Sequence, residues 1–302
     1  MSFKLHIFVK IAGLFIFLLA LFNVQVSIQA NAKEAAQNNT QNKLPQEDII
    51  HLANYTAVYD LRLDAASTKS GITNYIGRMV YDFKGDMCDG YTSQVRFVSR
   101  VDGVEMQTML NDYQISTFES GDGKTLRFIV KNLTNEILDK EREGVATQDG
   151  KILTVQMVKP EKKEITLNAA QYPTFETIEM IKRALKGETF YQSTVFDGTD
   201  DDDKLSNSTI FIGKSHIQEV DKSNKVLNPL TKMIYWPVTV TYFDDDKNLD
   251  GLPVYRTSFL LYKNGVTRDM LMDYGNFSVR AKLVDLIIDK DSQKQNCEHG
   301  EL

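Results

Sequence analysis

The chain has 302 residues, of which 42% are hydrophobic and 25% are charged, and its formal net charge at pH 7 is -6. This composition supports a folded protein with a substantial core and excludes general disorder. The acidic balance argues against nucleic acid and against anionic membrane as main partners.

The first 32 residues are typical of a secretory signal peptide. Lys4 and Lys10 lie at the start, residues 11–24 are uncharged and largely apolar, and Ala30 and Ala32 offer small residues for cleavage. An uncleaved anchor is the alternative, but the apolar stretch is shorter than the ~18 residues that a spanning helix needs. We expect cleavage after Ala30 or Ala32, export to the periplasm, and a mature net charge of about -8 after loss of the two lysines.

Residues 33–51 form a polar stretch with little to bury, so we expect a disordered lead before a single folded domain over 52–290. Apolar and polar residues alternate from Asn54 to Leu63, which predicts a strand with one face in water. Similar strand signals, separated by turns rich in Gly, Asp and Asn, recur over residues 72–83, 91–101, 106–118, 126–131, 153–157, 189–196, 209–212, 233–243, 254–262, 268–274 and 277–288.

Residues 80–101 predict a hairpin whose acidic, glycine-containing turn carries Cys88. The chain has only two cysteines, and the other one is Cys297 in the polar tail over 291–302. Export to an oxidising compartment favours a disulfide between Cys88 and Cys297, which would hold the tail beside the hairpin.

One stretch, residues 168–186, has helical instead of strand periodicity. Gly187 follows it as a helix C-cap, and Pro173 lies in its opening turns. We expect one amphipathic helix, kinked or begun near Pro173, that packs an apolar stripe against the sheet. The stripe consists of Phe175, Ile178, Ile181 and Leu185.

Three details refine the strands of the second half of the chain. Pro237 predicts an edge strand or a bulge, because proline cannot donate a ladder hydrogen bond. The pair Asn264-Gly265 is a strong hairpin turn signal. Near Leu283 the apolar positions shift from odd to even, which predicts a bulge. About a dozen strands, one helix and no linker-like gap predict a single, mainly β domain with an antiparallel sheet that is curled or closed.

Local motifs for catalysis or metal binding are missing from the sequence. His51, His216 and His299 are too far apart to form a local metal motif. Residues 246–251 match the opening of an EF-hand loop, but Thr257 stands where the loop needs a bidentate Glu. The pair of carboxylates that a glycan hydrolase needs has no local motif, so this function stays an alternative that the sequence does not support.

Aromatic side chains are spread over the predicted strands. They could line a cavity for an acyl chain or form an ordinary core, and the pattern does not distinguish the two. The residues are Tyr55, Tyr59, Phe97, Phe128, Trp236 and Phe259.

Several short segments together resemble the EipB family of alphaproteobacterial cell-envelope integrity proteins. They are Ala57–Leu63 (AVYDLRL), Ser70–Thr73 (SGIT), Gly77–Phe83 (GRMVYDF), Cys88–Tyr91 (CDGY), Asp122–Lys124 (DGK), Phe196–Gly198 (FDG), Tyr235–Val238 (YWPV), Leu252–Arg256 (LPVYR) and Met272–Gly275 (MDYG). The resemblance runs from about Ala57 to Leu286 and implies a monomeric periplasmic β-spiral, an open barrel of antiparallel strands around a kinked helix. It also implies a Cys88–Cys297 disulfide, a tetratricopeptide-repeat partner, a role in envelope integrity, and neither a cofactor nor an enzymatic activity.

The leading hypothesis is therefore a non-enzymatic factor that maintains the cell envelope by protein binding. A carrier of a lipid or lipoprotein acyl chain is the alternative, and a glycan hydrolase is a weaker one.

Overall fold

The computed structural model describes residues 50–200, 204–243 and 253–289. The expected signal peptide, Cys297 and residues 246–251 lie outside these residues. The described part forms one antiparallel sheet of 15 strands with one α-helix, α1 (Pro173–Leu185), and two short 3₁₀ helices, η2 (Thr68–Ser70) and η3 (Lys225–Leu230). No helix in it is long and apolar enough to cross a membrane.

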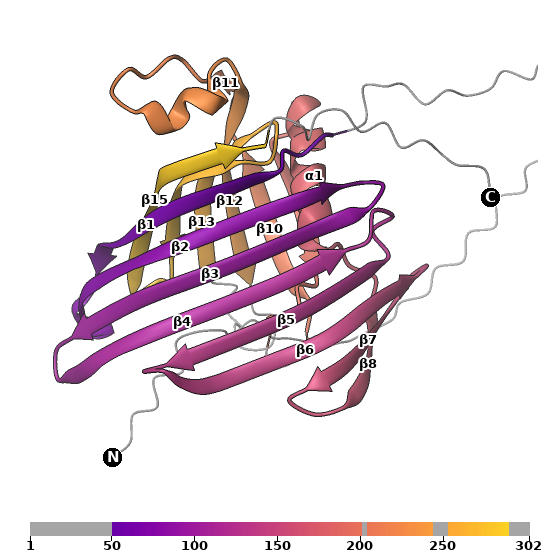
Figure 1. Cartoon of the computed structure of the whole chain (residues 1–302), viewed down its shortest axis with the longest axis horizontal. Helices are drawn as coiled ribbons and strands as arrows, with labels where there is room; N and C mark the ends of the chain where they lie inside the picture. The colour runs from indigo at the N-terminus through magenta and orange to yellow at the C-terminus, as the bar shows by residue number, and fades with distance from the viewer. Residues whose placement is uncertain (1–49, 201–203, 244–252, 290–302) are drawn as a thin grey trace, which may run out of the picture.

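The first eight strands follow one another in space as they do in sequence. They are β1 (Tyr55–Ala66), β2 (Ile72–Asp86), β3 (Gly90–Gly103), β4 (Met106–Glu119), β5 (Thr125–Thr134), β6 (Ile137–Asp149), β7 (Ile152–Lys159) and β8 (Lys163–Asn168). They cross the front of the molecule in Figure 1.

The strands after α1 form the rest of the sheet, behind the first eight in Figure 1. They are β9 (Phe190–Val195), β10 (Ser206–Ile212), β11 (His216–Ile217), β12 (Ile234–Phe243), β13 (Pro253–Tyr262), β14 (Thr267–Asp273) and β15 (Phe277–Ile288). The last strand, β15, pairs with the first, β1, and this pairing joins the two halves.

The two ends of the sheet, β8 and β9, are separated in the sequence only by α1 and its flanks. They approach each other through one parallel bridge between Gln171 and Val195. Gln171 donates its backbone N–H to the carbonyl of Thr194 at 2.9 Å and accepts from the N–H of Phe196 at 3.0 Å. The sheet is therefore curled but not closed, and we call this meeting line the seam.

Helix α1 begins at Pro173 and is not kinked by it, because proline at the first helical position lacks only an N–H that would be unbonded there anyway. Ile181 is fully buried, and Phe175 and Ile178 pack against the same core. Leu185, which we expected in this stripe, is 43% exposed. It is the last residue of the helix, and Met180 and Ala184 fill the buried face in its place.

Most expected strands are present, but β6, β8 and the two-residue β11 were not predicted. On β6 the inward positions are Arg142, Gly144 and Ala146, so the apolar alternation that marks a half-buried strand is absent. Arg142 is 3% exposed and donates to the carbonyl of Gly198 at 2.9 Å. A Cβ on Gly144 would lie 2.7 Å from Phe128 Cζ, so glycine is required there for the ring to pack.

The detailed predictions for the second half have mixed outcomes. The turn at Gly265 joins β13 and β14 with a φ of 86° at the glycine, as expected. The bulge near Leu283 is confirmed, because Tyr59 pairs with Leu283 while Val58 pairs with Asp285. Pro237 pairs with Leu260 of β13, and β12 is not an edge strand, so the edge half of the prediction was wrong; the ladder on the other side of β12 is nevertheless interrupted at Pro237. Pro237 is tolerated because it lies beyond the last β10 pair, Ile212 with Val238, and before the β11 pairing.

Buried residues form two clusters. The larger one fills the space between α1 and the inner faces of β1, β2, β12 and β15, and it includes Ile50, so the fold begins within the expected lead. The smaller one lies under β5, β6 and β7, where Phe128 meets Phe196 edge-on at 5.9 Å.

Candidate functional site

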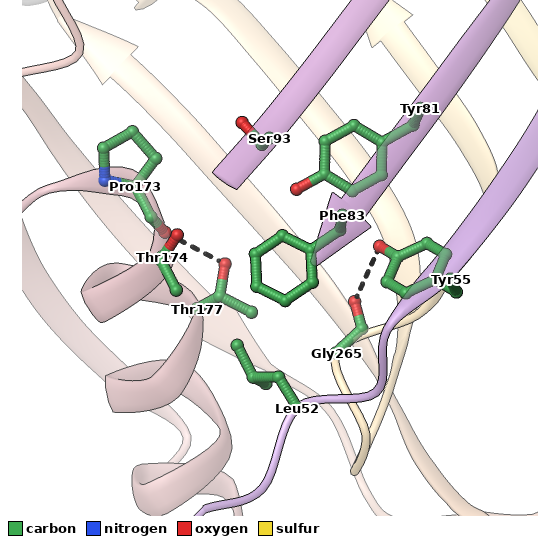
Figure 2. A pocket seen from close by; sticks show the side chains of 9 residues that line it. All are labelled: Leu52, Tyr55, Tyr81, Phe83, Ser93, Pro173, Thr174, Thr177 and Gly265. Carbon is green, nitrogen blue, oxygen red and sulfur yellow. Dashed lines mark hydrogen bonds between the residues drawn. The ribbon is translucent and has the colours of Figure 1, made fainter. Parts of the chain in front are cut away.

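A small cavity lies where the first turn of α1 meets the inner faces of β1, β2 and β3 (Figure 2). Tyr55, Tyr81 and Phe83 form its aromatic side, and hydroxyl groups of Thr174 and Thr177 approach from the helix. Tyr55 donates to the carbonyl of Gly265 at 3.4 Å. The alternation of strand residues places these rings inward, as the sequence predicted for Tyr55.

The cavity volume is about 90 Å³. Ligand pockets typically have ~300–1,000 Å³, while a water molecule takes ~30 Å³ of liquid volume. This space therefore suits water molecules or a very small group, and it is too small for an acyl chain.

Glu119, the last residue of β4, caps the helix from a distant strand. Its carboxylate accepts the Thr174 N–H at 3.0 and 3.1 Å and the Thr174 hydroxyl at 2.7 Å. The residue at the N-cap position, Tyr172, makes no side-chain capping bond. A carboxylate at a helix N-terminus is favourable because the first N–H groups are unbonded and the helix dipole is positive there.

Glu119 and Glu176 are the two described carboxyl groups whose pKa values are raised to about 7. Burial is the main cause in both, because it disfavours the charged form. Thr174 partly lowers the pKa of Glu119, whereas Ser193 lowers and Asp197 raises the pKa of Glu176. The two groups thus respond to different neighbours.

The other predicted site residues are scattered. Cys88 lies in the exposed turn between β2 and β3, where its N–H is bonded to Asp86 at 2.7 Å. His51 and His216 are exposed, and His216 stacks on Tyr235. Within the described ranges, no group of three or more His, Cys, Asp or Glu side chains is placed to hold a metal ion.

The aromatic residues singled out in the sequence are mostly core. Tyr55, Tyr59, Phe128 and Trp236 are buried, and Phe97 and Phe259 are partly buried against the main cluster.

The outer face of β2, β3 and β4 carries a pattern that the sequence analysis missed. Apolar and arginine side chains alternate both along and across the strands: Ile76 pairs with Arg100 and Arg100 with Leu110, while Val98 pairs with Arg78. Sequence alternation shows only that this face of each strand is solvent-exposed. The alternation of arginine and apolar side chains across the strands becomes visible only when the strand register is known. We call the set the outer checkerboard; its members are Ile76, Arg78, Val80, Arg96, Val98, Arg100 and Leu110.

The outer checkerboard is exposed and nearly neutral. Its apolar members Ile76, Val98 and Leu110 are 40%, 41% and 46% exposed. The arginines are paired with aspartates, for example Arg78 with Asp60 at 2.7 Å and Arg96 with Asp112 at 2.8 Å. Two shallow hollows of about 340 and 440 Å³ lie on this face.

Comparisons with known proteins agree with this fold. A family model described as EipB-like matches residues 46–289. The cell envelope integrity protein EipB of Brucella abortus (strain 2308) is 44% identical over 250 residues, which cover 82% of this chain and 89% of that protein. The crystal structure of a beta-barrel-like protein of the domain of unknown function DUF1849 from Brucella abortus superposes with a TM-score of 0.77 at 44% identity, covering 80% of this chain and all of that one. The chain belongs to the EipB-like family.

Proposed function

We propose that this protein is a non-enzymatic periplasmic factor that maintains cell-envelope integrity by binding another protein through the outer checkerboard. The family supports the envelope role, since its curated member is named a cell envelope integrity protein. The partner that the family resemblance implies is a periplasmic tetratricopeptide-repeat protein, with the chain itself acting as a monomer.

The observation that carries protein binding is the mixture of exposed aliphatic side chains and arginines on one rigid sheet face. Protein interfaces are enriched in arginine, whose long stem packs while its guanidinium pairs. Val98 lines one of the two hollows and Val80 lines the other, and both hollows could accept a partner's side chains. A flat sheet face of this kind favours a protein surface over a small molecule.

The structure gives less support to the alternatives. A lipid or lipoprotein carrier needs room for an acyl chain, and the cavity at the helix N-terminus is far too small. A glycan hydrolase needs two cooperating carboxyl groups, and Glu119 is already engaged with Thr174.

Photo-crosslinking in cells tests the proposal. A photoreactive amino acid placed at Val98 should crosslink to a tetratricopeptide-repeat protein, while the same group at Ile217, which is 58% exposed on β11, should not. Equal products from both positions, or none from Val98, would contradict the assignment of this face.

Complementation gives the second readout. Val98→Asp and Leu110→Asp should fail to restore growth of a deletion strain under envelope stress, although the protein accumulates normally. Ile217→Asp is the matched control and should restore growth. Full rescue by the Val98 and Leu110 variants would show that this face does not serve the envelope role.

A further inference from the structure

The seam contains a groove that the proposed function does not use. It lies between α1, β9 and the segment 169–171, next to the bridge from Gln171 to Val195. Its volume of about 300 Å³ is at the lower end of the ~300–1,000 Å³ range of ligand sites. Unlike the cavity in Figure 2, the seam groove is open to solvent and large enough for a small organic ligand.

Two polar atoms at the seam groove are buried without a hydrogen-bond partner. Tyr191 is only 7% exposed and its hydroxyl bonds to no protein group, and the side-chain carbonyl oxygen of Gln171 is in the same state. Both residues line the groove. Nearby on α1, Glu176 is 8% exposed and its Oε1 atom also has no partner. Buried polar atoms are nearly always bonded, so the two unbonded atoms that line the groove, those of Tyr191 and Gln171, indicate a binding place for a polar ligand.

Arg183 is the one basic side chain among the described residues that line the groove, and two carboxylates hold it. Arg183 donates to Glu179 at 2.6 Å and to Glu188 at 2.7 Å. Its guanidinium lies 4.3 Å from the centre of the Tyr191 ring. One guanidinium against two carboxylates leaves no free cation to select an anion. These groups therefore disfavour an anionic ligand.

The remaining lining residues both donate and accept hydrogen bonds. Gln171 and Gln192 supply amides, and Ser193 and Thr194 supply hydroxyls. Among the described residues that line the groove, alanine and the Tyr191 ring are the only apolar groups. A peptide that paired with the edge of β9 would gain its specificity from pockets for alternate side chains, and the lining residues here mainly offer amide and hydroxyl groups.

We propose that the seam groove binds a short, uncharged glycan segment, with Tyr191, Gln171 and Gln192 as its hydrogen-bonding residues. Sugar hydroxyls are donors and acceptors at once, which matches a lining of amides and hydroxyls around an arginine that two carboxylates already hold. The site would bring an envelope glycan to the edge of the sheet, whereas the outer checkerboard faces a protein.

Isothermal titration with the trisaccharide of N-acetylglucosamine tests this inference, with maltotriose as a second neutral probe. The wild-type chain should bind at least one of them saturably. Tyr191→Phe should weaken binding roughly three- to tenfold, the loss expected for one uncharged hydrogen bond. Gln192→Leu, at an exposed position where folding is not at risk, should weaken it by a similar factor.

Gln114→Leu is the matched control, because Gln114 lines a hollow of comparable size on the outer face. Its affinity for the trisaccharide should stay within twofold of wild type. The proposal would be overturned if neither sugar binds saturably, or if Gln114→Leu weakens sugar binding as much as Tyr191→Phe does. It would also be overturned if an extended peptide, and not a sugar, competes for the groove. The proposal would also fail if Tyr191→Phe lowers the melting temperature while neither sugar raises the melting temperature of the wild type. Ordered water alone would then satisfy the Tyr191 hydroxyl.

Discussion

Glu119 ties the end of β4 to the first turn of α1, two places 55 residues apart in sequence. Removing this carboxylate leaves the Thr174 N–H and hydroxyl buried without a partner. Glu119→Ala should therefore lower the free energy of unfolding by about 1–3 kcal/mol, measured by urea denaturation. Glu119→Gln keeps an acceptor oxygen and should cost less.

Glu143→Ala is the control for this prediction. Glu143 faces outward on β6 and makes only a long contact of 3.8 Å with Lys159. Its loss should change the free energy of unfolding by less than about 0.5 kcal/mol. Equal effects at Glu119 and Glu143 would show that the distant cap contributes nothing.

The two buried carboxyls predict how stability depends on pH. Their pKa rises from an ordinary 4.5 to about 7 on folding, so the folded state binds protons more tightly than the unfolded state. Their contribution is fully present below about pH 4.5 and is lost as pH rises through 7. The free energy of unfolding should fall by about 1–3 kcal/mol per group between pH 5 and pH 8.

Urea denaturation across this pH range measures the effect. Glu119→Gln and Glu176→Gln cannot ionise, so each should flatten the curve, and the double variant should flatten it most. A wild-type stability that is constant or rises from pH 5 to pH 8 would contradict the raised pKa values.

At the residue scale, the sequence could not show the cap. Glu119 ends a strand and carries no local motif, and its meaning depends on Thr174, which the fold brings to it. The one available hint was negative: the residue before Pro173 is Tyr172, which is not a capping residue, so the helix start needed help from elsewhere.

At the scale of elements, helix α1 packs through one central residue. Ile181 is 0% exposed in the main cluster, whereas Leu185 at the helix end is 43% exposed. Ile181→Ala should lower the free energy of unfolding by roughly 2–5 kcal/mol, because it removes buried methyl groups and leaves a cavity. Leu185→Ala, the matched control, should cost less than about 0.5 kcal/mol.

Thermal and urea unfolding of both variants would check this contrast. A cost below about 0.5 kcal/mol at Ile181 would show that α1 does not contribute its face to the core. Similar losses at the two positions would show that the end of the helix is as firmly packed as its centre.

Periodicity predicted most strands because every second residue of a half-buried strand is apolar and faces the core. Helical periodicity predicted α1, and a shift of the apolar positions along the last strand predicted the bulge opposite Tyr59. Strand β6 escaped because its inward side is occupied by Arg142, Gly144 and Ala146, whose fit depends on Phe128 and Gly198 across the core. Packing of that kind is a property of the assembled sheet, and no single window of sequence contains it.

At the scale of the whole molecule, the sequence predicted a curled sheet but not where it joins. The pairing of β1 with β15 and the bridge at Gln171 connect residues far apart in the chain. Both candidate surfaces depend on that geometry: the outer checkerboard needs the register of three strands, and the seam groove exists only where β9 meets the segment 169–171. Both candidate surfaces are therefore formed by long-range pairing and have few local sequence signals.

The disulfide between Cys88 and Cys297 remains a prediction at the same scale, since Cys297 lies outside the described residues. Cys88 lies on an exposed turn that joins β2 to β3. The bond would close a loop of about 210 residues and stabilise the fold by at most roughly 5 kcal/mol, because it restricts the unfolded chain. Cys88→Ser should therefore lower the melting temperature under oxidising conditions and leave it nearly unchanged with reductant present.

Mass spectrometry of the exported protein, alkylated without reductant, measures the bond directly. A linked peptide containing both cysteines is the expected product, and full labelling of both thiols would refute the pairing. Melting temperatures add an independent check. If the cross-link forms, the wild-type protein with reductant should melt at the same temperature as Cys88→Ser without reductant. If wild type melts at the same temperature with and without reductant while the peptide is linked, the bond forms but does not stabilise the fold, and the chain-entropy argument fails for this protein.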